Sequence, residues 1–299
     1  LCSSLTGVIG FPVTPFKEDH SLDLEGYRTN VSYMMQQSMC AIVAAGGTGE
    51  LYSLSPDEIR KVVEVTIDEV KGKIPVIAGV GFAGGLSTKL ASQAANCGAD
   101  AVLAFPPYYP NAEMDGLIDY YSSIAKASGL GVLGYSRDWA HFTPDQAEQL
   151  ANIPNVVAWK DGSADIRRYQ MIRERLGDKL HWIGGAGDDM VPAYYSIGIR
   201  VYTSSISAVA PKLSIKLHEL GAAQAVDELN QVVKEHVVPL YALRTKRKGY
   251  EVSAMKAMLN MLGLHGGIVR PPLVEVSEAE KKELQNILEG WRKADFLDL

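Results

Sequence analysis

The sequence predicts a (β/α)8 TIM barrel with a C-terminal helical extension. Short apolar runs recur eight times along the first two thirds of the chain, and segments with helix-start chemistry separate them. Strands that alternate with helices form parallel βαβ units, and eight such units close into a barrel. A doubly wound open sheet is the competing arrangement, because it uses the same alternation.

Each predicted strand is an apolar run bounded by glycine, proline or polar residues, which is typical of a strand buried on both faces. Such short runs favour strands over helices. The predicted strands are Val8–Gly10, Ala41–Ala44, Pro75–Ala78, Ala101–Phe105, Val132–Tyr135, Val156–Trp159, Leu180–Ile183 and Val201–Thr203.

The segments between these runs begin with helix-start signals. Ser55-Pro56-Asp57-Glu58 combines an N-cap serine, a proline at the first helical position and a glutamate at the third. Thr143-Pro144-Asp145-Gln146 repeats this capping box. We expect Asp23 to cap the first helix and Ser277, with Glu280, to cap the last.

After about residue 207 the strand pattern stops and only helical patterns follow. The helical segments span residues 212–220, 222–247, 251–262 and 277–292. We therefore expect a barrel core over residues 1–207. Residues 208–299 would supply the last barrel helix and a helical extension, in one structural unit with the core.

The composition argues against several classes of protein. A net charge of −6 disfavours nucleic acid or an anionic membrane as the main partner. No apolar stretch reaches the length of a membrane span. Three cysteines are too few for a disulfide framework, which favours a reducing cytoplasm. The six histidines are scattered without an i, i+4 pair, so we expect no metal site.

Lys160 ends the sixth apolar run and precedes the turn-like Asp161-Gly162-Ser163. Desolvation at the end of a buried strand would lower the pKa of the amine below its usual value of about 10.4. A partly neutral amine can attack a ketone and form a Schiff base. The alternative, which local sequence alone favours, is a lysine that reaches water or pairs with Asp161.

In a βα barrel the working residues lie at the C-terminal ends of the strands. The second strand ends in Gly46-Gly47-Thr48-Gly49-Glu50, where backbone N–H groups and the Thr48 hydroxyl could converge on an anion. An ordinary glycine-rich turn is the alternative. The eighth strand leads into Ser204-Ser205, whose hydroxyls suit a polar substrate but also suit helix capping.

The fifth strand ends at Tyr135, followed by Ser136-Arg137-Asp138. A phenol close to a Schiff-base lysine could move protons during catalysis, and a structural hydrogen bond is the alternative use. Arg137 could bind a substrate carboxylate through its two-pronged guanidinium or pair with Asp138.

A second hypothesis is an NAD-dependent oxidoreductase. Gly79-Val80-Gly81-Phe82-Ala83-Gly84 is a Gly-x-Gly-x-x-Gly segment between a predicted strand and a helix. The acidic residue that should hold the ribose belongs at the end of the next strand. Asp100 instead precedes that strand, which disfavours the hypothesis.

Six ordered segments resemble the dihydrodipicolinate synthase / N-acetylneuraminate lyase family of Schiff-base barrels over nearly the whole chain. Within this family, Gly-Gly-Thr-Gly-Glu and the Arg-Asp pair after the tyrosine are most similar to the decarboxylating 5-dehydro-4-deoxyglucarate dehydratases. The segments are Phe11-Pro12-Val13-Thr14-Pro15-Phe16, Gly46-Gly47-Thr48-Gly49-Glu50, Pro107-Tyr108-Tyr109, Tyr135, Lys160-Asp161 and Gly267-Ile268-Val269-Arg270-Pro271-Pro272-Leu273.

The resemblance implies a role for each matching residue. Lys160 would form the imine and Tyr135 would shuttle protons, while Gly47 and Thr48 would hold the carboxylate beside the ketone. Tyr109 would reach into the site of a neighbouring subunit, which implies a homotetramer built from dimers. The implied substrate is a keto-deoxy sugar diacid, and no cofactor is needed because the lysine supplies the electron sink.

The implied reaction converts 5-dehydro-4-deoxy-D-glucarate to 2,5-dioxopentanoate, water and carbon dioxide. Many family members carry threonine at the position of Gly47, and the synthases carry an arginine at the position of Ala140. Ser136 and Trp139 stand where the dehydratases are expected to carry asparagine. A 2-keto-3-deoxy sugar acid aldolase, a synthase-like lyase and a catalytically silent barrel therefore remain alternatives.

Overall fold

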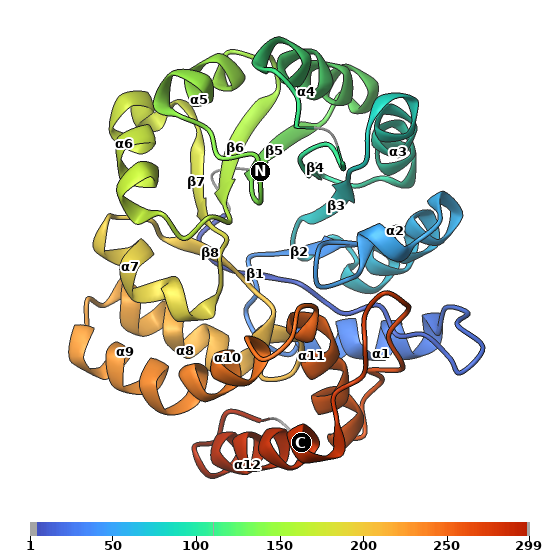
Figure 1. The fold of residues 1–299 in the computed structure, drawn as a ribbon, viewed down its shortest axis with the longest axis vertical. Coiled ribbons are helices and arrows are strands. Elements are labelled where there is room, and N and C mark those ends of the chain that lie inside the picture. Colours follow the sequence, from blue (N-terminus) through green and yellow to red (C-terminus); the bar gives the residue numbers. More distant parts are fainter. Residues whose placement is uncertain (1–4, 110, 298–299) are drawn as a thin grey trace.

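The strands form a closed parallel barrel in the computed structural model, which describes residues 5–109 and 111–297 (Figure 1). Each strand pairs with its neighbours in chain order, and the eighth pairs with the first. This closure confirms the predicted barrel and excludes the open sheet. The strands are β1 (Gly7–Gly10), β2 (Ala41–Ala44), β3 (Val76–Val80), β4 (Ala101–Ala104), β5 (Gly131–Ser136), β6 (Val156–Asp161), β7 (His181–Gly184) and β8 (Val201–Ser204).

A ring of helices surrounds the barrel (Figure 1). Short 3-10 turns occur between some strands and their helices: η2 (Leu51–Ser53), η3 (Gly177–Lys179), η4 (Asp188–Met190) and η5 (Ile206–Ala208). The ring helices are α1 (Leu24–Met34), α2 (Pro56–Val70), α3 (Gly84–Cys97), α4 (Met114–Ser128), α5 (Pro144–Ala151), α6 (Ile166–Leu176), α7 (Val191–Ser196) and α8 (Pro211–Ala222).

The predicted helix starts are formed. Asp23 caps α1 by accepting a hydrogen bond of 3.0 Å from the backbone N–H of Gly26. In each capping box, the N-cap hydroxyl accepts from the backbone three residues on, and that residue's side chain accepts from the N-cap N–H. The boxes pair Ser55 with Glu58, Thr143 with Gln146 and Ser277 with Glu280.

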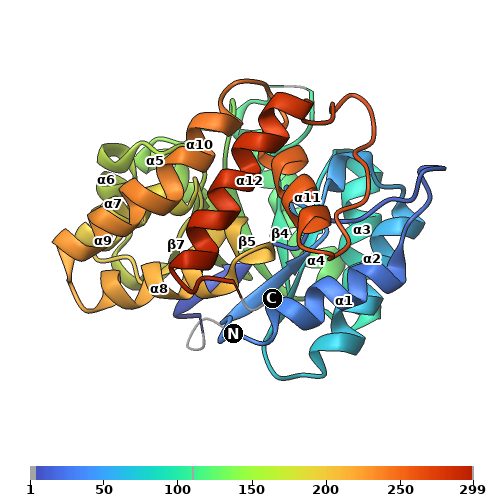
Figure 2. The same cartoon turned by 90° about the horizontal axis from the view of Figure 1, so that it is seen from below.

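The extension consists of α9 (Val226–Val232), α10 (Val238–Arg244), α11 (Tyr250–Met261) and α12 (Glu278–Lys293). Figures 1 and 2 show α12 packed on the outside of α10 and α11. One uninterrupted helix was expected up to residue 247, but a π-helical turn, η6 (Val233–Val237), joins α9 to α10. Pro239 lies at the start of α10, directly after the π-helical turn. Because proline lacks an N–H and its ring crowds the preceding turn, regular α-helical hydrogen bonding is interrupted there.

Apolar side chains fill two layers. The inner layer lies within the barrel, and the outer layer lies between the strands and the ring helices. Alternate residues of each strand serve the two layers, as Val8 and Ile9 do in β1. Because the interior is packed, it is no channel, and the space open to a ligand lies at the ends of the strands. The inner layer includes Ile9, Ala41, Val43, Ile77, Leu103, Leu133, Ile183 and Val201.

The Gly-x-Gly-x-x-Gly segment has a packing role. Gly79 lies within β3, and a Cβ atom there would come 2.0 Å from the carbonyl oxygen of Ala45. The carboxylate of Asp100 accepts a 2.8 Å hydrogen bond from the backbone N–H of Val76, at the N-terminal end of β3. Both observations differ from the geometry of a dinucleotide site, where the glycines follow the strand and the acid meets the ribose.

Within the described ranges, no helix is both long and apolar enough to span a lipid bilayer. The same ranges contain no group of three His, Cys, Asp or Glu side chains placed to bind a metal ion. Cys40 and Cys97 are free thiols, and Cys2 lies outside the described residues.

Candidate active site

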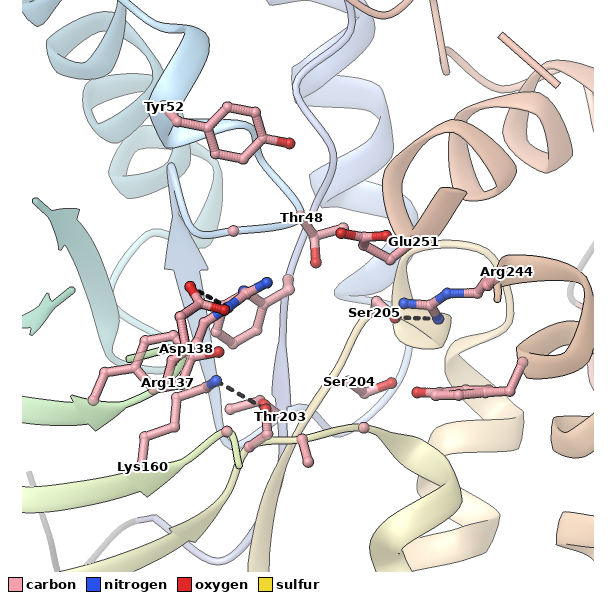
Figure 3. Close-up of a pocket in the computed structure, with 18 residues that line it drawn as sticks. Thr48, Tyr52, Arg137, Asp138, Lys160, Thr203, Ser204, Ser205, Arg244 and Glu251 are labelled. Atoms are coloured by element: carbon pink, nitrogen blue, oxygen red, sulfur yellow. Dashed lines mark hydrogen bonds and ion pairs between the residues drawn. The ribbon is translucent and has the colours of Figure 1, made fainter. Parts of the chain in front are cut away.

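A cavity of about 320 Å³ lies at the C-terminal ends of the strands, and Arg244 of α10 and Glu251 of α11 form part of its lining (Figure 3). It brings together residues from β5, β6 and β8, from several loops and from the extension. The lining residues are Phe11, Gly47, Thr48, Tyr52, Tyr135, Arg137, Asp138, Lys160, Gly162, Gly185, Ala186, Gly187, Thr203, Ser204, Ser205, Tyr241, Arg244 and Glu251.

Lys160 lies within β6, which continues to Asp161 and is therefore longer than predicted. The strand extends because Lys160 still pairs with both neighbours, opposite Tyr135 of β5 and Ile183 of β7. Its side chain points into the cavity but is only 3% exposed. The amine donates a 3.0 Å hydrogen bond to the carbonyl oxygen of Gly185. The lysine thus neither reaches bulk water nor forms an ion pair with Asp161.

The amine of Lys160 lies against aromatic rings. Nζ is 3.5 Å from the centroid of the Tyr135 ring and 5.7 Å from that of Phe11. Burial lowers the pKa of Lys160 below 10.5, and the positive charge of Arg137 adds to this effect. The phenol of Tyr135 opposes it without cancelling it. A larger fraction of the amine is therefore neutral near pH 7 than in an exposed lysine, as a nucleophilic lysine requires.

Tyr135 is buried at the C-terminal end of β5. Burial acts to raise its pKa, but the positive charges of Lys160 and Arg137 outweigh burial, so the pKa is lowered below 10.0. A phenol with a lowered pKa exchanges its proton more readily, which suits general acid–base chemistry.

Arg137 forms the predicted ion pair with Asp138 and also lines the cavity, and its binding of a substrate carboxylate stays a prediction. Its Nε lies 3.4 Å from the Asp138 carboxylate, and its side chain also lines the cavity. A Cβ atom on Gly47 would lie 3.4 Å from Nη1 of Arg137. The electrostatic interaction with Tyr135 raises the pKa of Arg137 above its usual value, so the guanidinium stays charged. The guanidinium and the Gly47 backbone thus face the same part of the cavity.

Contacts with residues outside the loop hold the Gly46–Glu50 loop in place. The Thr14 hydroxyl donates a 2.8 Å hydrogen bond to the carbonyl oxygen of Gly49. Glu50 and Lys256 of α11 form a fully buried ion pair. The Lys256 amine also donates to the carbonyl oxygen of Ile268 at 2.8 Å. The extension therefore holds the loop that presents Gly47 and Thr48 to the cavity.

The two serines after β8 differ in their contacts. The Ser204 hydroxyl donates to the carboxylate of Asp188 and accepts a 2.9 Å hydrogen bond from the Ser207 N–H. It is fully buried, so Ser204 contributes to the cavity wall while its hydroxyl is already bonded. The Ser205 hydroxyl accepts a 3.0 Å hydrogen bond from Nη1 of Arg244.

Sequence reasoning missed three lining residues of the extension, Tyr241, Arg244 and Glu251. They come after the last predicted strand in the sequence, and no local motif marks them as cavity residues. It also missed Tyr52 of η2. A search for polar residues near the helix ends of the extension would have found Arg244 and Glu251, but it would not have placed them in the cavity.

Tyr109 lies outside the Lys160 cavity in the single chain. It is 92% exposed and has a φ of +78°, a conformation that costs energy for a bulky residue. With Tyr108, Phe105 and Trp139 it lines an apolar groove of about 350 Å³, which adjoins the Lys160 cavity and shares lining residues such as Gly47 and Arg137 with it.

Comparisons with known proteins place the chain in a family. The model of the dihydrodipicolinate synthetase family matches residues 4–290. A protein of Bradyrhizobium diazoefficiens named "Probable 5-dehydro-4-deoxyglucarate dehydratase" is 36% identical over 282 residues, which cover 93% of this chain and 90% of that protein.

A protein of Ralstonia nicotianae with the same name is 35% identical over 95% of this chain and 92% of its own length. The crystal structure of dihydrodipicolinate synthase from Bacillus clausii superimposes with a TM-score of 0.92 at 27% identity, covering 97% of this chain and 99% of that one. The chain belongs to the dihydrodipicolinate synthetase family.

Proposed function

We propose that this protein is a Schiff-base lyase that converts 5-dehydro-4-deoxy-D-glucarate to 2,5-dioxopentanoate, water and carbon dioxide. The observation that carries the proposal is the buried amine of Lys160, held 3.5 Å from the centre of the Tyr135 ring inside a polar cavity. Relatives that carry the name of this dehydratase cover nearly the whole chain.

The first chemical step is imine formation. The neutral amine of Lys160 adds to the ketone carbon, and the carbinolamine then loses water. The resulting iminium draws electrons from the adjacent methylene and makes its protons acidic. Tyr135 is the proposed group that moves protons at this carbon, since its lowered pKa favours proton exchange.

Elimination and decarboxylation follow from the same electron sink. Loss of a methylene proton forms an enamine, which expels the hydroxyl of the next carbon as water and leaves a double bond conjugated with the iminium. Electrons from the bond to the distal carboxylate then pass through this double bond to the Lys160 nitrogen, and carbon dioxide leaves. Protonation of the chain and hydrolysis of the imine release the product and consume one proton overall.

Gly47 and Thr48 are proposed to bind the carboxylate beside the ketone. Both line the cavity, in a loop that the Glu50–Lys256 ion pair anchors. The guanidinium of Arg137 faces the same region and adds a positive charge that a carboxylate can use. Ser205 is proposed to add a hydroxyl on the side of the cavity away from Lys160 (Figure 3), and Ser204 forms part of the wall there with its own hydroxyl bonded to Asp188.

A synthase function is less well supported, because the arginine that the resemblance implies for the synthases is replaced by Ala140. This alanine is 2% exposed, and its carbonyl oxygen accepts a 3.0 Å hydrogen bond from the Ser136 hydroxyl. A buried methyl group cannot bind a carboxylate. An aldolase would use the same lysine and tyrosine, so only the reaction product separates it from the dehydratase.

We also propose a homotetramer built from dimers, located in the cytoplasm. The exposed and conformationally strained Tyr109 beside an apolar groove supports a contact with a neighbouring subunit. Sedimentation equilibrium of the wild-type protein and of Tyr109→Ala tests this assembly. A wild-type protein that sediments as a monomer at micromolar concentration contradicts it.

The decisive experiment incubates the protein with pyruvate and borohydride, digests it and locates the added mass. We expect the reduced adduct on Lys160 and none in Lys160→Met. An adduct on another lysine overturns the catalytic assignment. Incubation with 5-dehydro-4-deoxyglucarate should then release carbon dioxide and 2,5-dioxopentanoate, whereas release of pyruvate would identify an aldolase.

A further inference from the structure

We propose that Arg244, with Ser205, binds the distal carboxylate of the substrate and thereby makes the site selective for diacids. This inference rests on the proposed function, which supplies a substrate with a carboxylate at each end. It assigns a role to an extension residue that lies on the far side of the cavity from Lys160 (Figure 3).

The charges of Asp188 and Asp189 act on the Arg244 guanidinium, but neither carboxylate lies within ion-pair distance of it. Among the described residues its polar contact is the 3.0 Å hydrogen bond to Ser205, and no carboxylate pairs with it. An arginine that lines a cavity and makes one side-chain hydrogen bond still has N–H donors free to bind a carboxylate. The other cavity arginine, Arg137, differs because Asp138 already lies 3.4 Å from its Nε.

The side chain of Arg244 is held in place before any ligand binds. Its guanidinium carbon lies 4.6 Å from the centre of the Tyr241 ring, and Ser205 holds Nη1. The Tyr241 hydroxyl in turn accepts a 2.8 Å hydrogen bond from the Asp188 backbone N–H and donates to its carboxylate at 3.3 Å. A guanidinium supported on two sides loses less conformational entropy on binding a carboxylate.

The two ends of the cavity carry groups that suit the two ends of a diacid. Figure 3 shows Lys160 and Arg137 on one side of the cavity, and Arg244 and Ser205 on the other. With the imine at Lys160, the carboxylate beside the ketone faces Gly47 and Arg137. The remaining chain then extends toward Arg244, where its terminal carboxylate forms an ion pair with the guanidinium.

Two keto acids that lack the hydroxyl eliminated in the proposed reaction allow binding at this subsite to be measured without turnover. 2-Oxoadipate has six carbons and a carboxylate at each end, while 2-oxohexanoate has the same length and lacks the distal carboxylate. Calorimetry would measure the dissociation constant of each for the wild-type protein, Arg244→Met, Arg244→Lys and the control Arg247→Met. Arg247 lies in the turn after α10 and is not part of the cavity lining.

We expect the wild-type protein to bind 2-oxoadipate about 10- to 100-fold more tightly than 2-oxohexanoate, the range for one charge-assisted contact. Arg244→Met should abolish this preference and leave the affinity for 2-oxohexanoate unchanged. Arg244→Lys should restore part of it, and Arg247→Met should match the wild-type protein.

The proposal is overturned if Arg244→Met keeps the preference, if it weakens both keto acids equally, or if the wild-type protein does not bind 2-oxoadipate. Equal weakening would indicate that Arg244 only supports the packing. Borohydride reduction of the same complexes tests the proposed function separately. A missing Lys160 adduct counts against the Schiff-base chemistry, while the calorimetric preference still decides the role of Arg244.

Discussion

A Cβ atom on Gly47 would lie 3.4 Å from Nη1 of Arg137, so a side chain larger than a methyl group at this position would compete with the guanidinium for space. The distance is an ordinary contact for one methyl group, but the branches of a threonine would press on the guanidinium. Glycine at this position, where the family resemblance implies threonine, therefore leaves room for the Arg137 side chain in the cavity.

Replacing Gly47 with threonine should therefore weaken substrate binding while the protein still folds. Gly47 has no positive φ, so its backbone accepts a threonine. Displacement of the Arg137 guanidinium should raise KM by about 10-fold, the value of one charge-assisted contact. Steady-state kinetics of Gly47→Thr measures this effect. The control Gly85→Thr, which has open space around its Cβ position, should keep the wild-type KM.

Tyr135→Phe should separate adduct formation from proton transfer. The ring that faces the Lys160 amine remains, so pyruvate and borohydride should still label Lys160. Loss of the hydroxyl should lower kcat by about 10²- to 10⁴-fold, the usual contribution of a general acid or base. Tyr121→Phe is the matched control, because that buried hydroxyl has no hydrogen-bond partner among the described residues. Unchanged kcat in Tyr135→Phe would remove Tyr135 from the mechanism.

The rate of adduct formation should rise with pH, because the neutral amine is the reactive form. Burial lowers the pKa of Lys160, so the rise should be centred below pH 10.5. The charge of Arg137 contributes to this lowering. Arg137→Met should therefore move the pH profile of borohydride labelling toward higher pH. A profile that stays in place, or moves toward lower pH, contradicts the electrostatic role of Arg137.

The sequence predicted most of the barrel because buried parallel strands leave a direct signal. Each strand is a short apolar run, and only the ends differ from the prediction. Strand β6 continues through Lys160 and Asp161 because these residues still pair with β5 and β7. Apolar patterning marks the buried part of a strand, while backbone pairing decides where the strand ends.

The cavity was predicted in part, for a related reason. Tyr135 ends a predicted strand, and Lys160, Gly47 and Thr48 follow predicted strands, so the barrel rule predicts that all four lie at one face. Arg244 enters the cavity because the extension folds back over the barrel mouth, and this long-range packing has no local pattern. Ser204 was expected to face a substrate, but its hydroxyl bonds to Asp188, a contact that no sequence spacing indicates.

Asp188→Asn should change how stability depends on pH. Burial raises the pKa of the Asp188 carboxyl from 3.8 to about 6, so the folded protein holds this proton more tightly than the unfolded chain. The tighter binding of this proton adds to the free energy of unfolding. This addition is fully present below pH 3.8 and is lost as the pH rises through 6. The unfolding free energy of Asp188→Asn, relative to the wild-type protein, should rise by about 3 kcal/mol between pH 4 and pH 8.

Urea unfolding at several pH values measures this difference. Ser204→Ala provides a second check, because the Ser204 hydroxyl lowers the Asp188 pKa by hydrogen bonding to the carboxylate. Its removal should move the loss of stability to higher pH. A relative free energy that stays constant from pH 4 to pH 8 would show that Asp188 does not titrate in this range.

The Glu50–Lys256 ion pair should show strong coupling in a double-mutant cycle. Both side chains are fully buried, and burial raises the pKa of Glu50 and lowers that of Lys256. Glu50→Leu or Lys256→Met alone leaves one buried charge without its partner, which costs about 3–5 kcal/mol. The double replacement removes both charges and should cost less than either single change.

Urea unfolding of the four proteins gives the coupling energy, and pyruvate labelling of Lys160 gives the effect on the site. Each single replacement should also weaken pyruvate binding, because Glu50 anchors the loop that carries Gly47 and Thr48. The control Lys246→Met removes an exposed ion pair with Glu283 and should change stability by less than about 1 kcal/mol. Additive costs in the cycle would mean that the two buried charges do not depend on each other, and that the extension holds the loop by apolar packing instead.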